Sequence, residues 1–440
     1  MKFVDLFCGI GGFHHALTDL GHECVFACDT DKHCRDVYQE NWDMTVFKDI
    51  RDWVDEIDEH EFLCAGFPCQ PFSKSGNQEG FHDKIRGTLF DEICKIIKKN
   101  KPTYLLLENV PNMRTHDEGN TMKTIRSVLQ DLGYFVKDQV LSPHQFGIPQ
   151  HRPRLFIVGF NKSQTKQFSK FKFPVPRSTK KETHIDTIHD INSEGNVPEE
   201  LAKVFNHWTD FMTKLPPGVK PPSPTWTMEF GRSYDLHEIH PVSKLTKEKI
   251  VSNLEKEGIK CSMRMTKQQL LSHYPPYIRN VTSRLPMWKK RFIIKNREFW
   301  EENKNIIGKE WLRITRNFSN THQKFEWHVG ESESRNLLDY MIHLRPSGIR
   351  VSKLDRIPAL VAISQIPIIG PWGRKLTPRE AANAQSFKQE FVLHEKDAYA
   401  YKQLGNTVNV EVVKLIVERM LLIDARKSSE SNDTIKHQRI

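Results

Sequence analysis

The first 160 residues alternate between short apolar runs and segments with the spacing of amphipathic helices. The runs at 2–7, 24–28 and 103–107 are typical of buried strands, and 88–99 and 121–132 have helical spacing. Strands and helices that alternate in this way form an open, mostly parallel sheet covered by helices. The pattern therefore predicts an α/β fold that binds its ligands at the carboxyl ends of the strands.

Two later segments and the length of the chain complete this outline. Residues 135–141 and 154–160 alternate between apolar and polar side chains, and we expect them to form an antiparallel pair. A chain of 440 residues exceeds one ordinary core, so a second domain should follow.

A glycine-rich turn lies between the first strand and the first helix. Gly9, Gly11 and Gly12 can bring the backbone close to a ligand. Asp29 ends the second strand at a distance along the chain that suits a ribose diol. Farther on, Asp49 and Ile50 are an acid and an apolar side chain suited to adenine. These features predict a nucleotide-like ligand.

Two reactive residue types stand at the ends of apolar runs. Cys69 directly follows Pro68, which cannot continue a strand ladder, and a thiol at this position suits a nucleophile. The alternative is an inert core cysteine. Glu108 directly follows the fully apolar run 103–107, which favours a functional acid over a structural one.

Charge is distributed unevenly along the chain. Residues 1–160 hold 18 Lys and Arg against 24 Asp and Glu, a net charge of −6. Residues 161–370 hold 35 against 22, a net charge of +13, and include the basic and aromatic stretch 288–292. This asymmetry favours a polyanionic partner gripped by the later region, the alternative being a merely solvated basic face.

The cysteine pattern and the length of the apolar runs indicate the redox environment of the protein and its relation to membranes. The eight cysteines form no Cys-x-x-Cys pair and no zinc pattern, which indicates reduced thiols and no metal site. Asp5 interrupts the first apolar run, so a signal peptide is not expected. No apolar segment reaches the roughly 18 residues of a membrane span. We expect a soluble, cytoplasmic protein without a membrane partner, and a disordered polar tail over 427–440.

Six blocks in order along the chain resemble the motifs of bacterial DNA (cytosine-5) methyltransferases of restriction–modification systems. They are Asp5–Gly12, Gly66–Gln70, Glu108–Val110, Gln150–Arg154, Arg374–Glu380 and Gln403–Val408. Two departures are Asp29, where family members often carry Glu, and a long spacer before the fifth block. The resemblance covers nearly the whole chain outside 161–370.

The resemblance implies a Rossmann-like S-adenosylmethionine-dependent methyltransferase fold with a second, smaller target-recognition domain. Residues 1–160 would bind the cofactor and catalyse the reaction, and 161–370 would recognise DNA. Residues 371–426 would return to complete the catalytic domain.

The chemistry of this family gives each catalytic residue a role. Cys69 would add to C6 of a cytosine flipped out of double-stranded DNA, which activates C5 for methylation. Glu108 would share a proton at N3 of the base. Arg154 would brace the base and the thiolate, with Arg152 supporting the same region. The methyl group would come from S-adenosylmethionine without a metal.

The resemblance also assigns residues to the cofactor and to DNA. The expected cofactor residues are Phe7, Gly9, Ile10, Gly11, Asp29, Thr30, Asp49, Ile50, Pro68, Leu89, Asn406 and Thr407. The expected DNA contacts are Ser75, Arg86, Lys289, Lys290, Arg291, Arg345 and Arg350.

Two other functions stay open at this point. One is a transfer-RNA cytosine-5 methyltransferase of the same fold, against which the long basic insert argues. The other is a non-catalytic DNA-binding relative, against which the intact Cys69, Glu108 and Arg154 argue. We expect a monomer that shares its DNA site with a restriction endonuclease without a stable complex.

Overall fold

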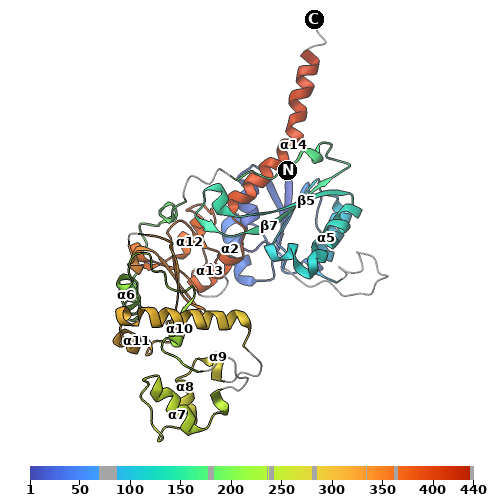
Figure 1. Cartoon of the computed structure of the whole chain (residues 1–440). Helices are drawn as coiled ribbons and strands as arrows, with labels where there is room; N and C mark the ends of the chain where they lie inside the picture. Colours follow the sequence, from blue (N-terminus) through green and yellow to red (C-terminus); the bar gives the residue numbers. More distant parts are fainter. Residues whose placement is uncertain are drawn as a thin grey trace. The chain divides into compact units, whose positions relative to one another are not determined.

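The computed structural model divides into two compact units (Figure 1). It describes residues 1–68, 87–176, 183–234, 236, 242–279, 285–332, 334–360 and 365–436, with side chains as far as Ile423. Unit 1 comprises Met1–Ser193, Asp355–Ser364 and Thr377–Ile440. Unit 2 comprises Glu194–Leu354 and Gln365–Leu376.

Unit 1 is built on a six-stranded sheet in the order β2-β1-β3-β4-β7-β5. The strands are β1 (Lys2–Leu6), β2 (Glu23–Cys28), β3 (Phe62–Ala65), β4 (Tyr104–Asn109), β5 (Tyr134–Leu141) and β7 (Arg154–Asn161). Strands β2, β1, β3 and β4 run parallel, and β7 pairs antiparallel with both β4 and β5. The predicted α/β fold and its antiparallel pair are confirmed.

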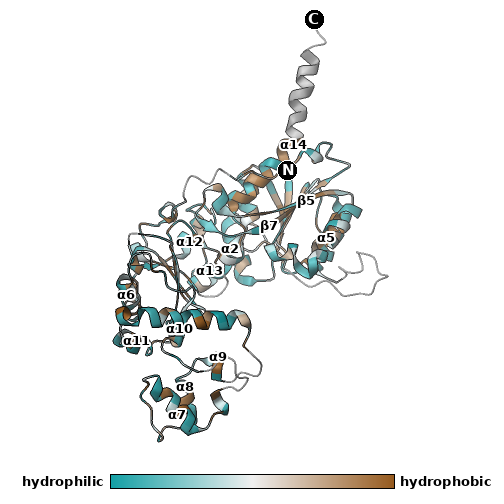
Figure 2. Ribbon diagram, in the orientation of Figure 1, coloured by the Kyte–Doolittle hydropathy of each residue, from teal (hydrophilic) through white to brown (hydrophobic). Residues whose placement is uncertain are grey.

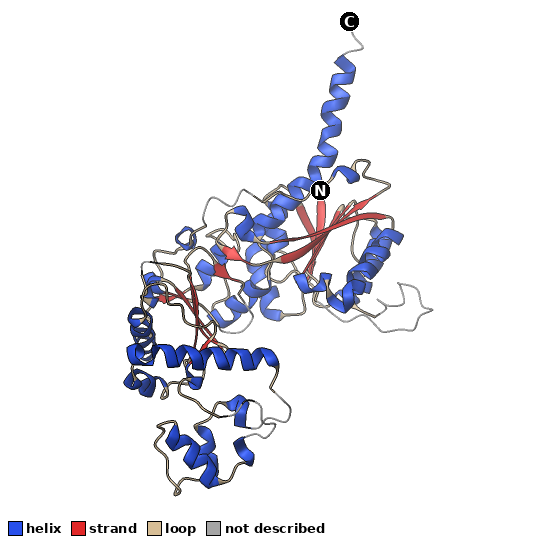
Figure 3. Ribbon diagram, viewed as in Figure 1, coloured by secondary structure: helices blue, strands red, loops and turns tan. Residues whose placement is uncertain are grey.

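Helices cover both faces of this sheet, as the ribbon view shows (Figure 3). On one face, Leu63 and Leu105 share a buried cluster with side chains of α4 (Leu89–Asn100) and α5 (Asn120–Asp131). On the other face, Phe3 contacts His14 of α1 (Gly12–Thr18). Strands β3 and β4 are buried along their whole length because helices cover both sides.

The last part of the chain returns to unit 1 as α12 (Pro378–Ala384), α13 (Asp397–Asn406) and α14 (Val410–Lys436). Helix α14 packs against α1. It continues to Lys436, past residue 427 where the sequence predicts disorder.

Unit 1 also contains residues 161–193, which the charge composition assigns to the second domain. The expected boundary at 160/161 falls instead at 193/194. Phe168 lies 4.9 Å from Phe135 of β5, and Phe171 lies 5.1 Å from Phe160 of β7, measured between ring centroids. The basic residues of 162–172 therefore accompany aromatic side chains that extend the core of the sheet.

A second correction concerns the end of the insert. Strand β12 (Ile357–Pro358) pairs with β6 (Gln150–His151), so residues 355–364 belong to unit 1. Residues 371–376, expected in the returning catalytic segment, belong to unit 2, where β14 (Arg374–Lys375) pairs with β13 (Ile368–Ile369). The chain thus passes between the units more often than one insertion predicts.

Unit 2 contains its own six-stranded sheet, in the order β14-β13-β10-β11-β9-β8. The other strands are β8 (Thr225–Trp226), β9 (Lys324–His328), β10 (Met341–Arg345) and β11 (Gly348–Ser352). One sheet face packs on α6 (Glu199–Lys214), α10 (Met287–Ile307) and α11 (Lys309–Thr315). Figure 2 shows the mixture of hydrophilic and hydrophobic residues along α10.

A buried acid joins a small helical cluster to α10 in unit 2. The cluster contains α7 (Lys247–Lys256), α8 (Lys267–Ser272) and α9 (Pro276–Arg279). Glu229 is fully buried and accepts hydrogen bonds from the hydroxyls of Tyr234 and Tyr277. Arg297 of α10 donates to the same carboxylate from two nitrogens, each at 3.1 Å.

Within the described residues, no helix combines the length and the apolar character needed to cross a bilayer.

Candidate active site

The glycine turn after β1 has two sides with different surroundings. Phe7, Gly9 and Gly11 all have positive φ angles, which favour glycine at the latter two. A Cβ atom at Gly9 would have no atom within 4 Å, whereas one at Gly11 would lie 2.3 Å from Trp42. Gly9 therefore leaves open space for a ligand, and Gly11 is required by packing against α2 (Lys32–Trp42).

Asp29 connects this turn to the end of β2. The backbone amide of Gly9 donates to Oδ2 of Asp29 at 2.9 Å, and the amide of Asp31 donates to Oδ1 at 2.8 Å. Burial raises the pKa of Asp29, although these two amides lower it. The carboxylate is thus fixed beside the open space at Gly9.

Asp49 and Ile50 lie in a short turn of helix after Phe47. Asp49 caps this turn through the amide of Arg51 and also forms an ion pair with its guanidinium at 2.5 Å. The hydrogen bond from Arg51 lowers the pKa of Asp49. Ile50 is buried and contributes an apolar wall.

A second group of residues gathers at the ends of β3 and β4. The side-chain amide of Asn109 donates to the carbonyl of Phe67 at 2.7 Å, which ties the two strand ends together. A Cβ atom on Gly66 would lie 3.6 Å from Oε2 of Glu108. The Glu108 carboxyl group therefore faces the segment that leads to Cys69.

Glu108 is paired with a cation from the neighbouring strand. Nε of Arg154, at the start of β7, lies 3.0 Å from Oε1 of Glu108. Burial raises the pKa of Glu108, and the charges of Arg154 and Arg152 offset only part of this effect. The protonated form of this acid is therefore more accessible than that of an ordinary glutamate.

Arg152 has a different environment from Arg154. Its side chain is 1% exposed and donates to the carbonyls of Gly405 and Thr407 at 2.7 and 2.6 Å. Its backbone amide donates to the hydroxyl of Ser142. Arg152 thus ties the returning segment to unit 1, while Arg154 contacts the buried acid.

These strand ends enclose one cavity of about 500 Å³ in unit 1. The predicted site residues that line it are Phe7, Gly9, Asp29, Thr30, Asp49, Ile50, Pro68, Leu89, Glu108, Arg154 and Asn406. The predicted residues Ile10, Gly11, Arg152 and Thr407 do not line it. Ile10 and Thr407 are buried in the packing around the turn, so they support the cavity without facing it.

The cavity also has lining residues that the sequence analysis does not assign to the site, although some of them stand within the motif blocks. They are Cys28, Asp31, Cys34, Lys48, Arg51, Gly66, Phe67, Asn109, Val110, Lys402 and Gly405. Most are chain neighbours of predicted residues. Lys402 and Cys34 are exceptions. The only sequence signal for Lys402 is helical spacing, because it precedes Asn406 by one turn of α13.

Three predicted residues, Cys69, Ser75 and Arg86, lie outside the described residues. The described chain leads as far as Pro68, which lines the cavity.

The predicted DNA contacts of unit 2 lie in two places. Lys289, Lys290 and Arg291 are in the first turns of α10, and the Lys289 ammonium lies 5.3 Å from the ring centroid of Tyr277. Arg345 and Arg350 lie on β10 and β11, and both donate to the carboxylate of Glu326 on β9.

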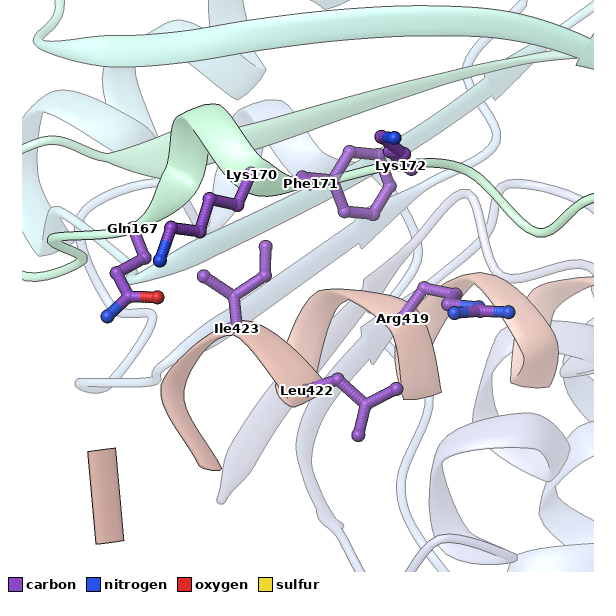
Figure 4. A pocket seen from close by; sticks show the side chains of 7 residues that line it. All are labelled: Gln167, Lys170, Phe171, Lys172, Arg419, Leu422 and Ile423. Carbon is purple, nitrogen blue, oxygen red and sulfur yellow. The ribbon is translucent and has the colours of Figure 1, made fainter. Parts of the chain in front are cut away.

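A separate cavity of about 400 Å³ in unit 1 has a largely apolar floor (Figure 4). It is lined by Gln167, Lys170, Phe171, Lys172, Arg419, Leu422 and Ile423. None of these residues is a predicted site residue, and no described residue of the lining is acidic. The larger cavity is therefore the candidate active site.

Comparisons with known proteins give matches over nearly the whole chain. The family described as C-5 cytosine-specific DNA methylase matches residues 1–422. The Type II methyltransferase M.AluI of Cellulosimicrobium cellulans is 31% identical over 482 residues, which cover 94% of this chain and 91% of that protein. The Type II methyltransferase M.BanI of Aneurinibacillus aneurinilyticus is 30% identical and covers 95% of each chain.

Among solved structures, the S. pombe Dnmt2 methyltransferase covers 96% of this chain and 98% of its own. Its sequence is 18% identical, with a TM-score of 0.46.

Proposed function

We propose how this chain, which belongs to the family of C-5 cytosine-specific DNA methylases, divides its reaction among its residues. The chain is a DNA cytosine-5 methyltransferase, and its relatives favour this function over the transfer-RNA and non-catalytic alternatives. The substrate is a cytosine in double-stranded DNA.

The Glu108–Arg154 pair carries the assignment of the chemistry. A cytosine accumulates negative charge on its ring when a nucleophile adds to C6, and a proton or a strong hydrogen bond at N3 stabilises that charge. Glu108 has a raised pKa and faces the end of β3. In this proposal Glu108 shares a proton with N3, and Arg154 fixes the carboxyl group in position.

Cys69 acts as the nucleophile in this proposal. It follows Pro68, which lines the same cavity as Glu108 and Arg154. Its thiolate forms a bond from Sγ to C6 of the flipped-out base, and the C5 proton leaves after methylation so that the bond to Cys69 breaks again. Nearby positive charge from Arg154 favours the thiolate.

The remaining lining residues fit S-adenosylmethionine. The open space at Gly9 admits backbone approach, the fixed carboxylate of Asp29 accepts hydrogen bonds from ribose hydroxyls, and Asp49 and Ile50 match the polar edge and the face of an adenine. S-adenosylmethionine supplies a methyl group already activated by a sulfonium. Phe7 and Asn406 complete the walls around it.

Unit 2 serves as the target-recognition domain. Its sheet turns Phe325 and Ile349 toward the core, and the opposite face carries Glu326, Arg345 and Arg350. One carboxylate between two guanidinium groups leaves net positive charge for DNA. Arginine pairs with guanine and glutamate accepts from cytosine at base edges, so this cluster is suited to reading a G·C pair.

The relatives support our proposal for the biological setting. M.AluI and M.BanI are Type II methyltransferases, and their likeness extends over the whole chain. This chain therefore protects host DNA in a restriction–modification system. It acts as a cytoplasmic monomer, alongside an endonuclease that cuts the same unmethylated site without binding the methyltransferase.

A covalent trap tests this proposal. On a duplex containing 5-fluorocytosine at the target, the final loss of a proton from C5 is blocked, so a nucleophilic enzyme remains attached to the DNA. In the presence of S-adenosylmethionine, we expect the wild type and Cys261→Ser to form a denaturant-resistant covalent adduct with this DNA. Cys69→Ala should form none. An adduct of undiminished yield in Cys69→Ala would refute the proposed nucleophile. Bisulfite sequencing of methylated plasmid DNA would locate the target cytosine for the duplex.

A further inference from the structure

The candidate active site has more charged residues than the proposed chemistry uses. Its acidic lining residues are Asp29, Asp31, Asp49 and Glu108, and its basic ones are Lys48, Arg51, Arg154 and Lys402. Glu108 pairs with Arg154 at the base-binding end, and Asp49 pairs with Arg51 at the proposed adenine end. Lys48 precedes Asp49 directly and shares that end. No group of the substrate or cofactor has yet been assigned to the ion pair of Asp31 and Lys402.

A continuous series of contacts connects this pair to the glycine turn. The amide of Gly9 donates to Asp29, whose other oxygen accepts the amide of Asp31. Asp31 caps α2 through the amide of His33 and binds Nζ of Lys402 at 2.9 Å. The pair therefore lies on the side of the cavity where the glycine turn and Asp29 meet.

The position of Lys402 on α13 supports the same placement. Gly405 and Asn406 line the cavity at the end of this helix. The next residue, Thr407, abuts the turn so closely that a Cβ on Gly12 would lie 2.6 Å from its hydroxyl oxygen. Lys402 stands one helical turn before Asn406, so its ammonium reaches the cavity beside the glycine turn.

We propose that Lys402 and Asp31 together bind the amino-acid end of S-adenosylmethionine. The Lys402 ammonium receives the α-carboxylate, and the Asp31 carboxylate receives the α-ammonium. Opposite charges then alternate around a four-membered ionic cluster. The ammonium of Lys402 has three hydrogens, of which Asp31 takes one, so donors remain for a carboxylate. This assignment rests on the proposed function, because it requires S-adenosylmethionine in this cavity.

The competing explanation is that the ion pair only fastens α13 to α2. A matched pair in unit 1 allows the two explanations to be separated. Lys388, also in the returning segment, binds Asp19 at 2.6 Å, and its side chain is 51% exposed compared with 45% for Lys402. Lys388 and Asp19 do not line the candidate active site.

The test compares two ligands that differ by one carboxylate. Isothermal titration measures the affinities of S-adenosylmethionine and decarboxylated S-adenosylmethionine for the wild type, Lys402→Met, Lys402→Arg and Lys388→Met. Because the ion pair is half exposed, we expect Lys402→Met to reduce the affinity for S-adenosylmethionine about five- to tenfold. The affinity for the decarboxylated ligand should fall less than about twofold. Lys402→Arg should restore most of the difference, and Lys388→Met should weaken neither ligand.

Each outcome decides a different question. Equal weakening of both ligands by Lys402→Met would show a fastening role alone and overturn this inference. Unchanged affinity for both ligands would overturn it as well. A wild type that binds neither ligand would refute the proposed cofactor together with this inference, so the two failures are distinguishable. Melting temperatures of all four proteins report any loss of folding.

Discussion

The sheets of the two units carry their charged residues in different places. In unit 1 they stand at strand ends, where Asp29 follows β2, Glu108 lies near the end of β4 and Arg154 begins β7. In unit 2 the charges lie along one face, where Arg350 of β11 is directly opposite Glu326 of β9. In unit 1 the strand ends converge on a cavity, whereas in unit 2 the charges lie side by side on neighbouring strands.

This difference indicates a division of labour. A cavity that holds a buried acid suits bond making, because charges near that acid are weakly screened. The net positive charge of residues 161–370 suits a long polyanion, because each contact contributes a little and depends on salt. Changes in unit 1 should therefore alter the rate of reaction, and changes in unit 2 should alter the affinity for DNA.

The largest effect should follow removal of the nucleophile in unit 1. Cys69→Ser should reduce methyl transfer by about 10³-fold or more, because an alcohol does not add to C6 at neutral pH. DNA and cofactor binding should remain. The measurement is transfer of a labelled methyl group, with Cys261→Ser in unit 2 as the matched control. Residual activity above a few per cent of the wild-type rate would exclude Cys69 from this role.

The next effect should follow replacement of the buried acid. Glu108→Gln keeps the size and shape of the side chain but cannot transfer a proton to N3, so the chemical step should slow by about 10²-fold. Single-turnover kinetics at saturating DNA and cofactor measure this step.

The pH dependence sharpens this prediction. Because its pKa is raised, Glu108 keeps its proton to a higher pH in the folded protein than in the unfolded chain, and it loses the proton as pH rises through the folded-state pKa. The wild-type rate should fall as pH rises through the pKa of Glu108, because the proton is lost. The pH profile of Glu108→Gln should lack this fall. If the variant melts early but reacts at the normal rate per folded molecule, Glu108 is only a structural acid.

These predictions also show which parts of the molecule the sequence can reveal. The strand-end residues were predictable because each adjoins a glycine turn, a proline or an apolar run within a few residues. The two roles of Arg152 and Arg154 were not, because the contacts of Arg152 are with carbonyls 253 and 255 residues away. Local sequence carries no signal for such pairings.

Composition misplaced the domain boundary for a related physical reason. Lysines between 162 and 172 count toward a basic region, but the aromatic residues among them decide where the segment packs. Similarly, Arg345 and Arg350 are predictable as cations, but their shared partner Glu326 becomes visible only when β9, β10 and β11 are aligned.

A smaller effect, confined to unit 2, should follow neutralisation of its buried acid. Glu229→Gln leaves Arg297 without its charged partner, which should reduce the free energy of unfolding of unit 2 by about 2–4 kcal/mol. DNA affinity should fall with it, and affinity for S-adenosylmethionine should not. Glu331→Gln, which changes an exposed pair with Lys220, is the control. Equal loss of both affinities would contradict the separation of the units.

The smallest effect should come from the basic start of α10. Replacing Lys289, Lys290 and Arg291 with Ala should reduce the slope of log DNA affinity against log salt concentration. The reduction should correspond to the loss of about two phosphate contacts, on cognate and scrambled duplexes alike. The reduction should fall short of three because Lys289 already lies over Tyr277. The control is replacement of Lys203, Lys304 and Arg313 with Ala, because each of these cations pairs with an acid on its own helix. An unchanged slope would place the phosphate contacts elsewhere.

The division of labour itself is tested most directly by steady-state kinetics of one variant from each unit. Methyl transfer is measured over a range of DNA concentrations for Glu108→Gln and for the triple alanine variant of α10. We predict that Glu108→Gln lowers kcat and leaves KM for DNA unchanged, whereas the triple variant raises KM and leaves kcat unchanged. A triple variant with reduced kcat at saturating DNA, or a Glu108→Gln enzyme whose defect lies in KM, would contradict the assignment of chemistry to the strand ends of unit 1 and of DNA binding to unit 2.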